Sequence, residues 1–553
     1  MSLPEKVPYR PGYELTLKRI FDRALYMFPD MEIVYRTSKG VERYTFKDFA
    51  DRVAKLASAL SSLGVGRLDR VATLDWNTHW HYETYFAAPM MGAVLHPVNI
   101  RLAPAEIAYV MGHAEDKVVV AHRDFIPLLE AIAPKVKSLE HIIVVDADAV
   151  PDKIGGVPAS HYEDLIKGQG GFEWPEVDED QPAAMGYTSG TTGLPKGVYH
   201  SHRAMVLHAL SGALNITSMG ERRLSSMDTI LHIVPMFHVY SWGLPYISAL
   251  LGMKQVYPGR LDPKVLLDLI VGEGVTFTAG VPTILYMLLS HPESGKYDLS
   301  GLTFVVGGSA LPRGLAEAAR KRGIYVYVGY GMTETAPILT LATLPPKYLD
   351  KSEEEKLELS LRTGWPIPLV DLMVADEDLN PVPRDGRTMG EIVVRAPWVT
   401  YEYYKNPEKT SQAWRGGWFH TGDIAVWMED GSIVIVDRDK DVIKSGGEWI
   451  SSVRLEDAIS RHPGVAQVAV IAARHEKWGE RPVAVIVPRE GWRDKVTHEE
   501  ITRFLMENFV EKGEMPKWWL PDKVILVEDL PKTSVGKINK RVLREKYGGV
   551  LAG

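Results

Sequence analysis

Hydrophobic positions in the first part of the chain follow helical and strand-like periods in turn. Between Phe46 and Leu63 the apolar residues recur at helical spacing, with Thr45 as a candidate N-cap and Gly64 as a stop. A strand is predicted at 70–76 and a second helix at about 80–91. Further strands are predicted at short β-branched runs, most of them separated by helical stretches such as 315–322: 117–121, 141–145, 275–279, 302–306 and 324–328. Strands that alternate with helices favour parallel α/β sheets.

The pattern changes from about Gly364. Short strands punctuated by glycine, proline and aspartate predict a small β-rich unit at about 364–436. The charged run 437–441 directly follows an apolar strand and predicts a hinge, and 442–553 is expected to form a small α+β domain. The predicted architecture is therefore α/β: a large N-terminal domain, 1–436, of parallel α/β sheets plus the β-rich unit, followed by a small mobile C-terminal domain.

Composition limits the class of protein. The 553 residues are 45% hydrophobic and 24% charged, which are ordinary globular values, and the length allows more than one domain. The net charge is −8 and no strongly basic stretch occurs, so a dedicated nucleic-acid binder is not expected. Cysteine is absent, which excludes disulfides, thiolate zinc sites and covalent catalysis by an enzyme thiol.

No secretory leader or transmembrane segment is expected. The first residues carry charges and prolines in place of an apolar leader, so a cytoplasmic protein is predicted. Segment 229–253 has no Asp, Glu, Lys or Arg and is long enough to span a bilayer. It nevertheless contains His232, His238 and two prolines, so we expect a buried core or the wall of an apolar pocket.

The segment 187–198, which reads YTSGTTGLPKGV, is the most informative in the chain. Its glycines, hydroxyl residues and lysine form a loop that can expose backbone N–H groups and a cation, as phosphate binding requires. Because Lys196 follows Pro195 and precedes Gly197, the loop is not a Walker motif, and its serine spacing is not that of a nucleophile elbow. The residues expected to contact phosphate are Thr188, Ser189, Gly190, Thr191, Thr192, Gly193 and Lys196.

Further motifs follow along the chain: GGSA at 307–310, YGMTET at 330–335, TGD at 421–423, DR at 437–438, KSGGE at 444–448 and PKTSVGK at 531–537. Together with the loop, they make the chain resemble the AMP-forming acyl-CoA synthetases and their adenylating relatives over essentially its whole length. Segment 446–451 is similar to the medium- and long-chain fatty acyl branch. Each short motif alone is weak, but the ordered set is specific.

The resemblance assigns nucleotide and metal binding to the central motifs, and the residue types suit these roles. Tyr330 can offer an aromatic face to adenine, and Glu334 is a hard oxygen ligand suited to Mg²⁺, with Thr188 as its hydroxyl partner. Asp423 can accept both ribose hydroxyls, with Arg438 beside it. A core tyrosine and a plain turn aspartate stay open as alternatives. The other expected nucleotide contacts are Gly308, Ser309, Ala310, Gly329, Gly331 and Thr333.

The resemblance divides the small domain between two steps. Lys537 corresponds to the lysine that orients the carboxylate and the α-phosphate during adenylation. Residue 540 is Lys where many relatives carry Arg. Lys440 is expected to be the pivot on which the domain turns. The approach of coenzyme A is expected along Lys444, Gly446, Gly447 and Trp449.

The acyl pocket is expected around segment 234–246. His238 corresponds to the family's histidine beside the reacting carboxylate, and Gly308 is also expected to contact the acid. Trp242 matches the position of an indole that closes an acyl tunnel in long-chain members. A core histidine and a core tryptophan remain alternatives. Two histidine pairs lack a third ligand, so metal sites are not expected at His79 with His81 or at His200 with His202.

The sequence therefore predicts an acid–thiol ligase that acts in two steps. A carboxylic acid, expected to be fatty, would react with ATP and Mg²⁺ to give an acyl-adenylate and pyrophosphate, and coenzyme A would then take the acyl group and release AMP. The expected catalytic residues are Lys537, His238, Lys196 and Glu334. Short-chain, hydroxy or aryl acids, an adenylation-only enzyme that loads a carrier protein, a luciferase and a non-catalytic nucleotide sensor stay open, as does a homodimer.

Overall fold

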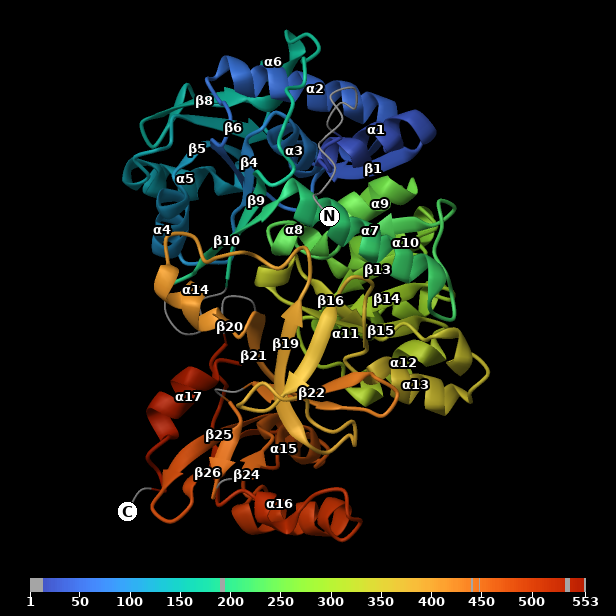
Figure 1. The fold of residues 1–553 in the computed structure, drawn as a ribbon, viewed down its shortest axis with the longest axis vertical. Coiled ribbons are helices and arrows are strands. Elements are labelled where there is room, and N and C mark those ends of the chain that lie inside the picture. The colour runs from blue at the N-terminus through green and yellow to red at the C-terminus, as the bar shows by residue number, and fades with distance from the viewer. Residues whose placement is uncertain (1–12, 189–193, 439–440, 447, 533–537, 552–553) are drawn as a thin grey trace, which may run out of the picture.

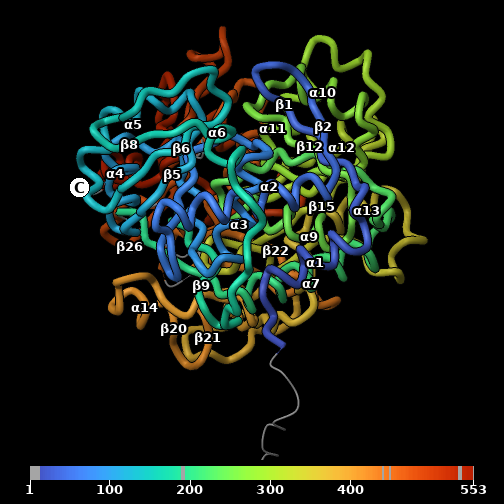
Figure 2. Tube along the Cα trace, turned by 90° about the horizontal axis from the view of Figure 1, so that it is seen from above, coloured from blue at the N-terminus to red at the C-terminus, as the bar shows by residue number. Residues whose placement is uncertain are grey.

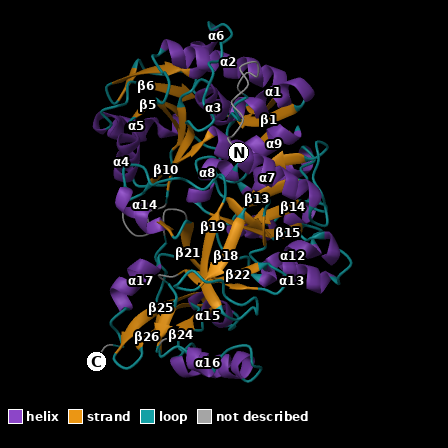
Figure 3. Ribbon diagram, viewed as in Figure 1, coloured by secondary structure: helices purple, strands orange, loops and turns teal. Residues whose placement is uncertain are grey.

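The computed structural model of the chain describes residues 13–188, 194–438, 441–446, 448–532 and 538–551. Within these ranges the strands form four sheets. The two large sheets occupy the N-terminal end of the molecule, and the β-rich sheet and the small C-terminal sheet follow toward the other end (Figure 1). Helices gather mainly around the two large sheets (Figure 3).

The first sheet has eight strands in the order β10-β9-β4-β3-β5-β6-β8-β7. Pairing is parallel from β9 through β4, β3, β5 and β6 to β8, as the alternation of helices and strands predicts. The strands are β3 (Arg70–Leu74), β4 (Val94–Pro97), β5 (Asp116–His122), β6 (His141–Val145), β7 (Lys153–Ile154), β8 (Val157–His161), β9 (Pro182–Tyr187) and β10 (Gly197–Ser201). The helices are α2 (Phe46–Ser62), α3 (His79–Met90), α4 (Pro104–Ala114), α5 (Ile126–Ile132) and α6 (Tyr162–Lys167).

The second sheet has nine strands in the order β17-β16-β15-β14-β13-β11-β12-β1-β2, with a parallel centre from β15 to β1. The strands are β1 (Glu32–Thr37), β2 (Gly40–Thr45), β11 (Thr229–Leu231), β12 (Lys254–Tyr257), β13 (Phe277–Gly280), β14 (Thr303–Val306), β15 (Tyr325–Gly331), β16 (Ile338–Leu341) and β17 (Trp365–Pro366). The helices are α1 (Leu17–Met27), α7 (His202–Ser218), α8 (Val239–Trp242), α9 (Leu244–Leu251), α10 (Pro263–Gly272), α11 (Pro282–Ser290), α12 (Arg313–Lys321) and α13 (Glu353–Leu361).

Two smaller antiparallel or mixed sheets complete the chain. The β-rich sheet contains β18 (Asp371–Ala375), β19 (Met389–Arg395), β20 (Trp414–Arg415), β21 (Trp418–Trp427) and β22 (Ile433–Arg438), with α14 (Pro407–Ala413) beside it. The C-terminal sheet contains β23 (Ile443–Ser445), β24 (Glu448–Ile450), β25 (Val465–His475), β26 (Gly479–Pro488) and β27 (Lys523–Leu526). Its helices are α15 (Ser452–Ser460), α16 (His498–Leu505) and α17 (Lys540–Tyr547).

The predicted α/β class is confirmed, and local signals explain where elements begin. In α2, the Thr45 hydroxyl accepts a hydrogen bond from the Asp48 backbone at 3.2 Å, and the Asp48 carboxylate accepts one from the Thr45 backbone at 2.9 Å. This capping box satisfies donors that the first helical turn leaves unpaired. Strand β22 continues to Arg438, two residues past the predicted end of the large domain. The domain boundaries themselves stay a prediction.

The main core lies between the two large sheets. Helix α3 is buried along its whole length, and in Figure 2 it lies between β5 and β6 of the first sheet and β12 and β15 of the second. It packs against segment 229–253, whose side chains are mostly buried. The Tyr85 hydroxyl donates to the Met236 carbonyl, and the Tyr246 hydroxyl donates to the Tyr85 carbonyl at 3.1 Å. The expected buried core is therefore confirmed for this segment.

The described residues contain no helix with both the length and the apolar character that crossing a membrane requires.

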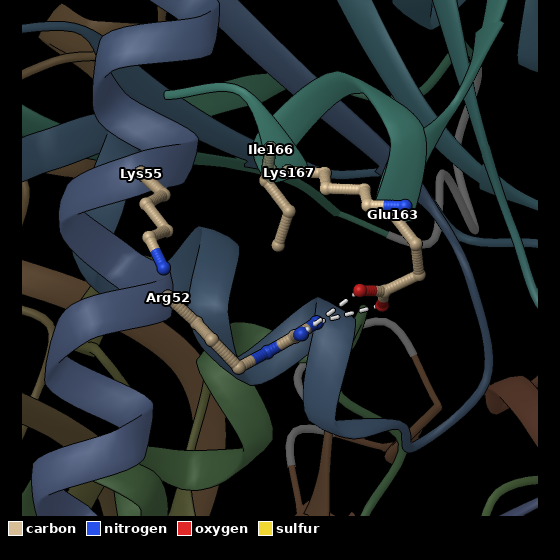
Figure 4. A pocket seen from close by; sticks show the side chains of 5 residues that line it. All are labelled: Arg52, Lys55, Glu163, Ile166 and Lys167. Atoms are coloured by element: carbon tan, nitrogen blue, oxygen red, sulfur yellow. Dashed lines mark hydrogen bonds and ion pairs between the residues drawn. The ribbon is translucent and has the colours of Figure 1, made fainter. Parts of the chain in front are cut away.

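A surface pocket of about 270 Å³ opens between α2 and α6 (Figure 4). It is lined by Arg52, Lys55, Glu163, Ile166 and Lys167. The guanidinium of Arg52 forms ion pairs at 2.7 Å with Glu163 and with the buried Glu83, which ties α2 to α3 and α6. None of the residues that the sequence predicts for ligand binding lines this pocket, so the candidate site lies elsewhere.

Candidate active site

The stem of the predicted phosphate loop is an antiparallel hairpin of β9 and β10. The Thr188 backbone donates to the Lys196 carbonyl at 2.9 Å, and the Lys196 backbone donates to the Thr188 hydroxyl at 3.2 Å. A Cβ at Gly197 would lie 2.7 Å from Cε of Met185, so a larger residue there would have to displace the end of that side chain. The hairpin therefore fixes both ends of the loop. Ser189, Gly190, Thr191, Thr192 and Gly193 lie outside the described residues.

Glu334 lies next to Lys196 in the fold, although the two are far apart in sequence. The Tyr403 hydroxyl donates to Oε1 of Glu334 at 2.7 Å, and Nζ of Lys196 lies 3.9 Å from the centroid of the Tyr403 ring. Burial lowers the pKa of Lys196, and the negative charge of Glu334 partly opposes this shift. Glu334 itself is buried, with 9% of its surface exposed. The ammonium group of Lys196 and the carboxylate of Glu334 thus both contact Tyr403.

The donor set at Glu334 fits a magnesium ion that also binds phosphate. No cluster of three or more His, Cys, Asp or Glu side chains suited to a metal occurs among the described residues. Mg²⁺ keeps several waters and is held by one or two carboxylates plus substrate phosphates. One carboxylate at Glu334 and the hydroxyl of Thr188 are therefore the kind of protein contribution that a Mg²⁺·ATP site requires.

Tyr330, Asp423 and Arg438 form a connected group. The Tyr330 hydroxyl donates to Oδ2 of Asp423 at 2.7 Å, and Nε of Arg438 lies 3.1 Å from Oδ1. The pairing of β21 with β22 places Asp423 directly opposite Arg438. Gly422, at φ +69°, turns the chain ahead of Asp423, which is only 3% exposed. Burial raises the pKa of Tyr330, so its hydroxyl stays protonated. The structure thus brings these three predicted residues together.

The glycine motifs lie at the carboxyl edge of the second sheet. Because β14 and β15 are parallel, the segments that follow them, 307–310 and 332–335, leave the sheet at the same edge, where ligands bind in open α/β sheets. Gly308 has φ +78°, and Ser309, Ala310 and Gly308 are exposed there. A Cβ at Gly331 would lie 1.8 Å from the Pro337 carbonyl oxygen, so the backbone just before β16 requires glycine at this position.

The acyl segment contains an unusual left-handed turn. Val239, Tyr240, Ser241 and Trp242 have φ between 42° and 58°, and Gly243 follows at 73°. Left-handed conformations cost L-residues roughly 1–2 kcal/mol each, so surrounding contacts have to hold the turn. Ser241 donates to the Val234 carbonyl at 2.9 Å, and the Tyr240 hydroxyl lies 3.1 Å from Nδ1 of His200.

Trp242 packs against the first glycine of the GGSA motif. A Cβ at Gly307 would lie 2.8 Å from Cη2 of the indole, so the ring rests on the backbone at that point. Trp242 and His238 are both half-buried. The turn therefore places Trp242 beside the GGSA motif, and its role as a tunnel residue or a core residue stays a prediction.

The histidines of the two pairs are core residues. His79, His81, His200 and His202 are all buried. Burial lowers the pKa of His81, His200 and His202 to about 4, and that of His79 well below its ordinary value. Neutral imidazoles of this kind serve packing and hydrogen bonding.

The small C-terminal part contains the residues predicted for coenzyme A. Lys444 is exposed, and its backbone donates to Glu480 at 2.8 Å. Gly446 has φ +61°, and a Cβ there would lie 2.9 Å from Cε3 of Trp478. Lys440, Gly447 and Lys537, together with the side chain of Trp449, lie outside the described residues.

The sequence interpretation did not assign a role to two residues that the structure places in contact with charged side chains, Tyr403 and Lys540. Tyr403, which contacts both Lys196 and Glu334, stands among four other aromatic or charged residues in the run 401–405, and these give no distinguishing signal. Lys540, noted only as a departure from Arg, binds the partly buried carboxylate of Glu456 at 2.7 Å and the Ser452 hydroxyl at 2.6 Å. A carboxylate that is partly buried needs a cation or a hydrogen-bond donor beside it, and this need could have indicated Lys540 as the partner of Glu456.

Comparison with known proteins identifies the class. The family model described as AMP-binding enzyme matches residues 21–404, and that of the AMP-binding enzyme C-terminal domain matches residues 454–537. The chain belongs to the AMP-binding enzyme family.

Named relatives cover nearly the whole chain. It is 47% identical over 544 residues to a long-chain-fatty-acid–CoA ligase of Thermus thermophilus, with 98% of this chain and 97% of the relative covered. It is 41% identical over 522 residues to a medium-chain-fatty-acid–CoA ligase of Ectopseudomonas oleovorans, with 93% and 92% covered. The solved structure of the anthranilate CoA ligase AuaEII with anthranoyl-AMP has a TM-score of 0.81 at 25% identity, with 98% and 99% covered.

Proposed function

We propose that the protein is an AMP-forming fatty acyl-CoA ligase. The observation that carries this proposal is the convergence of two groups at one edge of the second sheet: Lys196 with Glu334 around Tyr403, and Tyr330 with Asp423 and Arg438. The first group suits triphosphate and its cation, and the second suits a nucleoside. Relatives with nearly full coverage are named as fatty-acid–CoA ligases.

In the first step, a carboxylate oxygen of the acid attacks the α-phosphorus of ATP, and the bond to pyrophosphate breaks. Lys196 and the loop that follows Thr188 would bind the β- and γ-phosphates. Asp423 would accept the ribose hydroxyls, with Arg438 holding its second oxygen. Glu334 and Thr188 would hold Mg²⁺, which supplies charge neutralisation at the phosphates when bound. Lys537 would orient the carboxylate and the α-phosphate, and His238 would contact the acid.

In the second step, the thiol of coenzyme A attacks the acyl carbonyl, and AMP leaves. No enzyme nucleophile takes part, which agrees with a chain that has no cysteine. We propose that Lys444, Gly446, Gly447 and Trp449 line the approach of coenzyme A. The two steps would use different faces of the small domain, which turns at Lys440. A homodimer and a cytoplasmic location stay predictions.

The acid is proposed to be a medium- or long-chain fatty acid. The segment that holds His238 and Trp242 is apolar and lacks charged side chains between Thr229 and Met253. Its half-buried indole lies beside Gly307, next to the motif expected to contact the adenylate. An apolar wall at the reacting end favours an alkyl chain over a charged or hydroxylated acid.

AMP release tests this function. The purified protein is incubated with ATP, Mg²⁺, coenzyme A and acids from two to eighteen carbons or aryl acids. We expect acid- and coenzyme-A-dependent AMP release that is highest for an alkyl acid of medium or long chain. Pyrophosphate release without thioester formation would identify an adenylation-only enzyme, and nucleotide binding without turnover of any acid would identify a sensor. Lys537→Ala serves as the inactive control.

A further inference from the structure

Tyr403 contacts both charged side chains of the proposed phosphate and metal site. Its hydroxyl donates to Oε1 of Glu334 at 2.7 Å, and Nζ of Lys196 lies 3.9 Å from its ring centroid. We propose that Tyr403 is a positioning residue of adenylation, which holds Glu334 for the metal and Lys196 for the nucleotide phosphates. This inference rests on the proposed function.

The position of the Tyr403 ring is determined by its backbone. The Tyr403 N–H donates to the Thr410 hydroxyl at 3.0 Å, and the following N–H, of Tyr404, donates to the Gly197 carbonyl at 2.8 Å. Tyr403 also forms a β-bridge with Val198 of β10. Only 6% of the residue is exposed. The backbone that carries the ring is therefore bound to the same hairpin that carries Lys196.

The hydroxyl acts on the carboxylate of Glu334. Because Oε1 is bound by Tyr403, the carboxylate is oriented, and no described residue forms a hydrogen bond with Oε2. The Glu334 carbonyl is held separately by the Thr400 N–H at 2.7 Å. A ligand fixed at one oxygen presents the other in a defined direction. Groups that orient a metal ligand in this way typically change metal affinity by about 10–100-fold when removed.

The ring face acts on the ammonium group of Lys196. A cation on the face of tyrosine is attracted by the π-electrons, and this holds a long, flexible side chain in place before phosphate arrives. Less side-chain freedom is then lost when the nucleotide binds. Donation from the hydroxyl to a carboxylate also increases electron density on the ring, so the two contacts strengthen each other.

The two contacts use different parts of the side chain, so two substitutions separate them. Tyr403→Phe keeps the ring face and removes the hydroxyl. Tyr403→Leu removes both. Tyr404→Phe is the matched control, because its ring lies 5.5 Å from that of His113 and contacts neither Glu334 nor Lys196. Circular dichroism and thermal denaturation establish that each variant is folded.

Metal binding is measured without turnover. Mn²⁺ replaces Mg²⁺ as the probe, and its binding to the protein with α,β-methylene-ATP is followed by electron paramagnetic resonance. For Tyr403→Phe we expect Mn²⁺ affinity to fall by about 10-fold, with unchanged calorimetric affinity for the metal-free nucleotide. For Tyr403→Leu, metal-free nucleotide affinity should also fall, by about 3- to 30-fold. Tyr404→Phe should match the unsubstituted protein in both measurements.

A double substitution shows whether Tyr403 acts through Glu334. If it does, Tyr403→Phe should cause no further loss of Mn²⁺ affinity in a Glu334→Gln background. An additional loss there, or an unchanged Mn²⁺ affinity in Tyr403→Phe alone, would overturn the proposal. No acid or coenzyme A is present, so this result is independent of ligase activity. A protein that binds Mn²⁺ and nucleotide normally but releases no AMP would refute the proposed function only.

Discussion

A methyl group added at Gly307 tests whether the Trp242 indole lines the acyl route. The new Cβ would lie 2.8 Å from Cη2 and 3.1 Å from Cζ3 of the indole, and 3.2 Å from the Gly329 carbonyl oxygen. The Gly329 carbonyl belongs to β15 and is held in the sheet, so the ring has to move. Overpacking of this kind costs about 1–3 kcal/mol. If that cost falls on the complex with the acid, it corresponds to a change of about 5- to 150-fold in kcat/KM for that acid.

The assay is the ratio of kcat/KM for long acids to that for short acids, measured by AMP release. We expect Gly307→Ala to shift this ratio in the same direction as Trp242→Ala, because both displace the indole from the same place. The double variant should behave like Trp242→Ala alone, since no ring remains for the methyl group to meet. Gly314→Ala in α12 is the control, because a Cβ there meets no atom within 4 Å.

Two results would refute this reasoning. One is an unchanged ratio in both single variants, with only a lower melting temperature, which would make Trp242 a packing residue. The other is an additive effect of the two substitutions, which would show that the methyl group acts on β15 and not on the indole.

Two further predictions concern the half-reactions and pH. Lys537→Ala should abolish acyl-adenylate formation but leave transfer from supplied acyl-adenylate to coenzyme A largely intact. Lys440→Pro should do the reverse, because a fixed φ restricts the hinge. Equal loss of both steps in both folded variants would exclude domain alternation. Stability to urea should fall as the pH is lowered from about 6.5 toward 4, because histidines in the unfolded chain then bind protons that the buried histidines of the folded protein do not bind. Burial raises the pKa of Asp75 to about 6, so this residue takes up a proton in the folded protein and offsets only part of the loss. A constant urea midpoint between pH 7.5 and 5 would contradict that second prediction. Burial lowers the pKa to about 4 in His81, His200 and His202 and to about 3 in His208 and His232.

Periodicity and capping signals were sufficient for the main elements. The run from Phe46 to Leu63 became α2, and the predicted strand 141–145 became β6 with the same bounds. These signals are local, because an amphipathic face and an N-cap need only neighbouring residues. The motifs likewise indicated Tyr330, Asp423 and Arg438, which the fold brings into contact.

The left-handed turn at 239–242 could not be predicted. Val239 is β-branched, and such residues avoid positive φ, so the local pattern argues against the observed conformation. Tertiary contacts determine it instead, including the hydrogen bond of Ser241 to Val234 and the contact of Tyr240 with His200. Tyr403 was missed for a similar reason, since its partners come from the residue before β10 and from the segment after β15.

The charged run 437–441, whose role as a hinge stays a prediction, begins and ends in specific contacts. Asp437 is 2% exposed and accepts a hydrogen bond from the Ser452 N–H at 2.5 Å, and Asp441 forms an ion pair with Arg544 of α17. Asp437 and Ser452 lie on opposite sides of Lys440 in the sequence, so their hydrogen bond spans the proposed pivot. A rotation at Lys440 would have to replace that bond with water or another donor, because a buried carboxylate left unpaired is costly. The predicted rotation would therefore have to break specific buried contacts on both sides of Lys440.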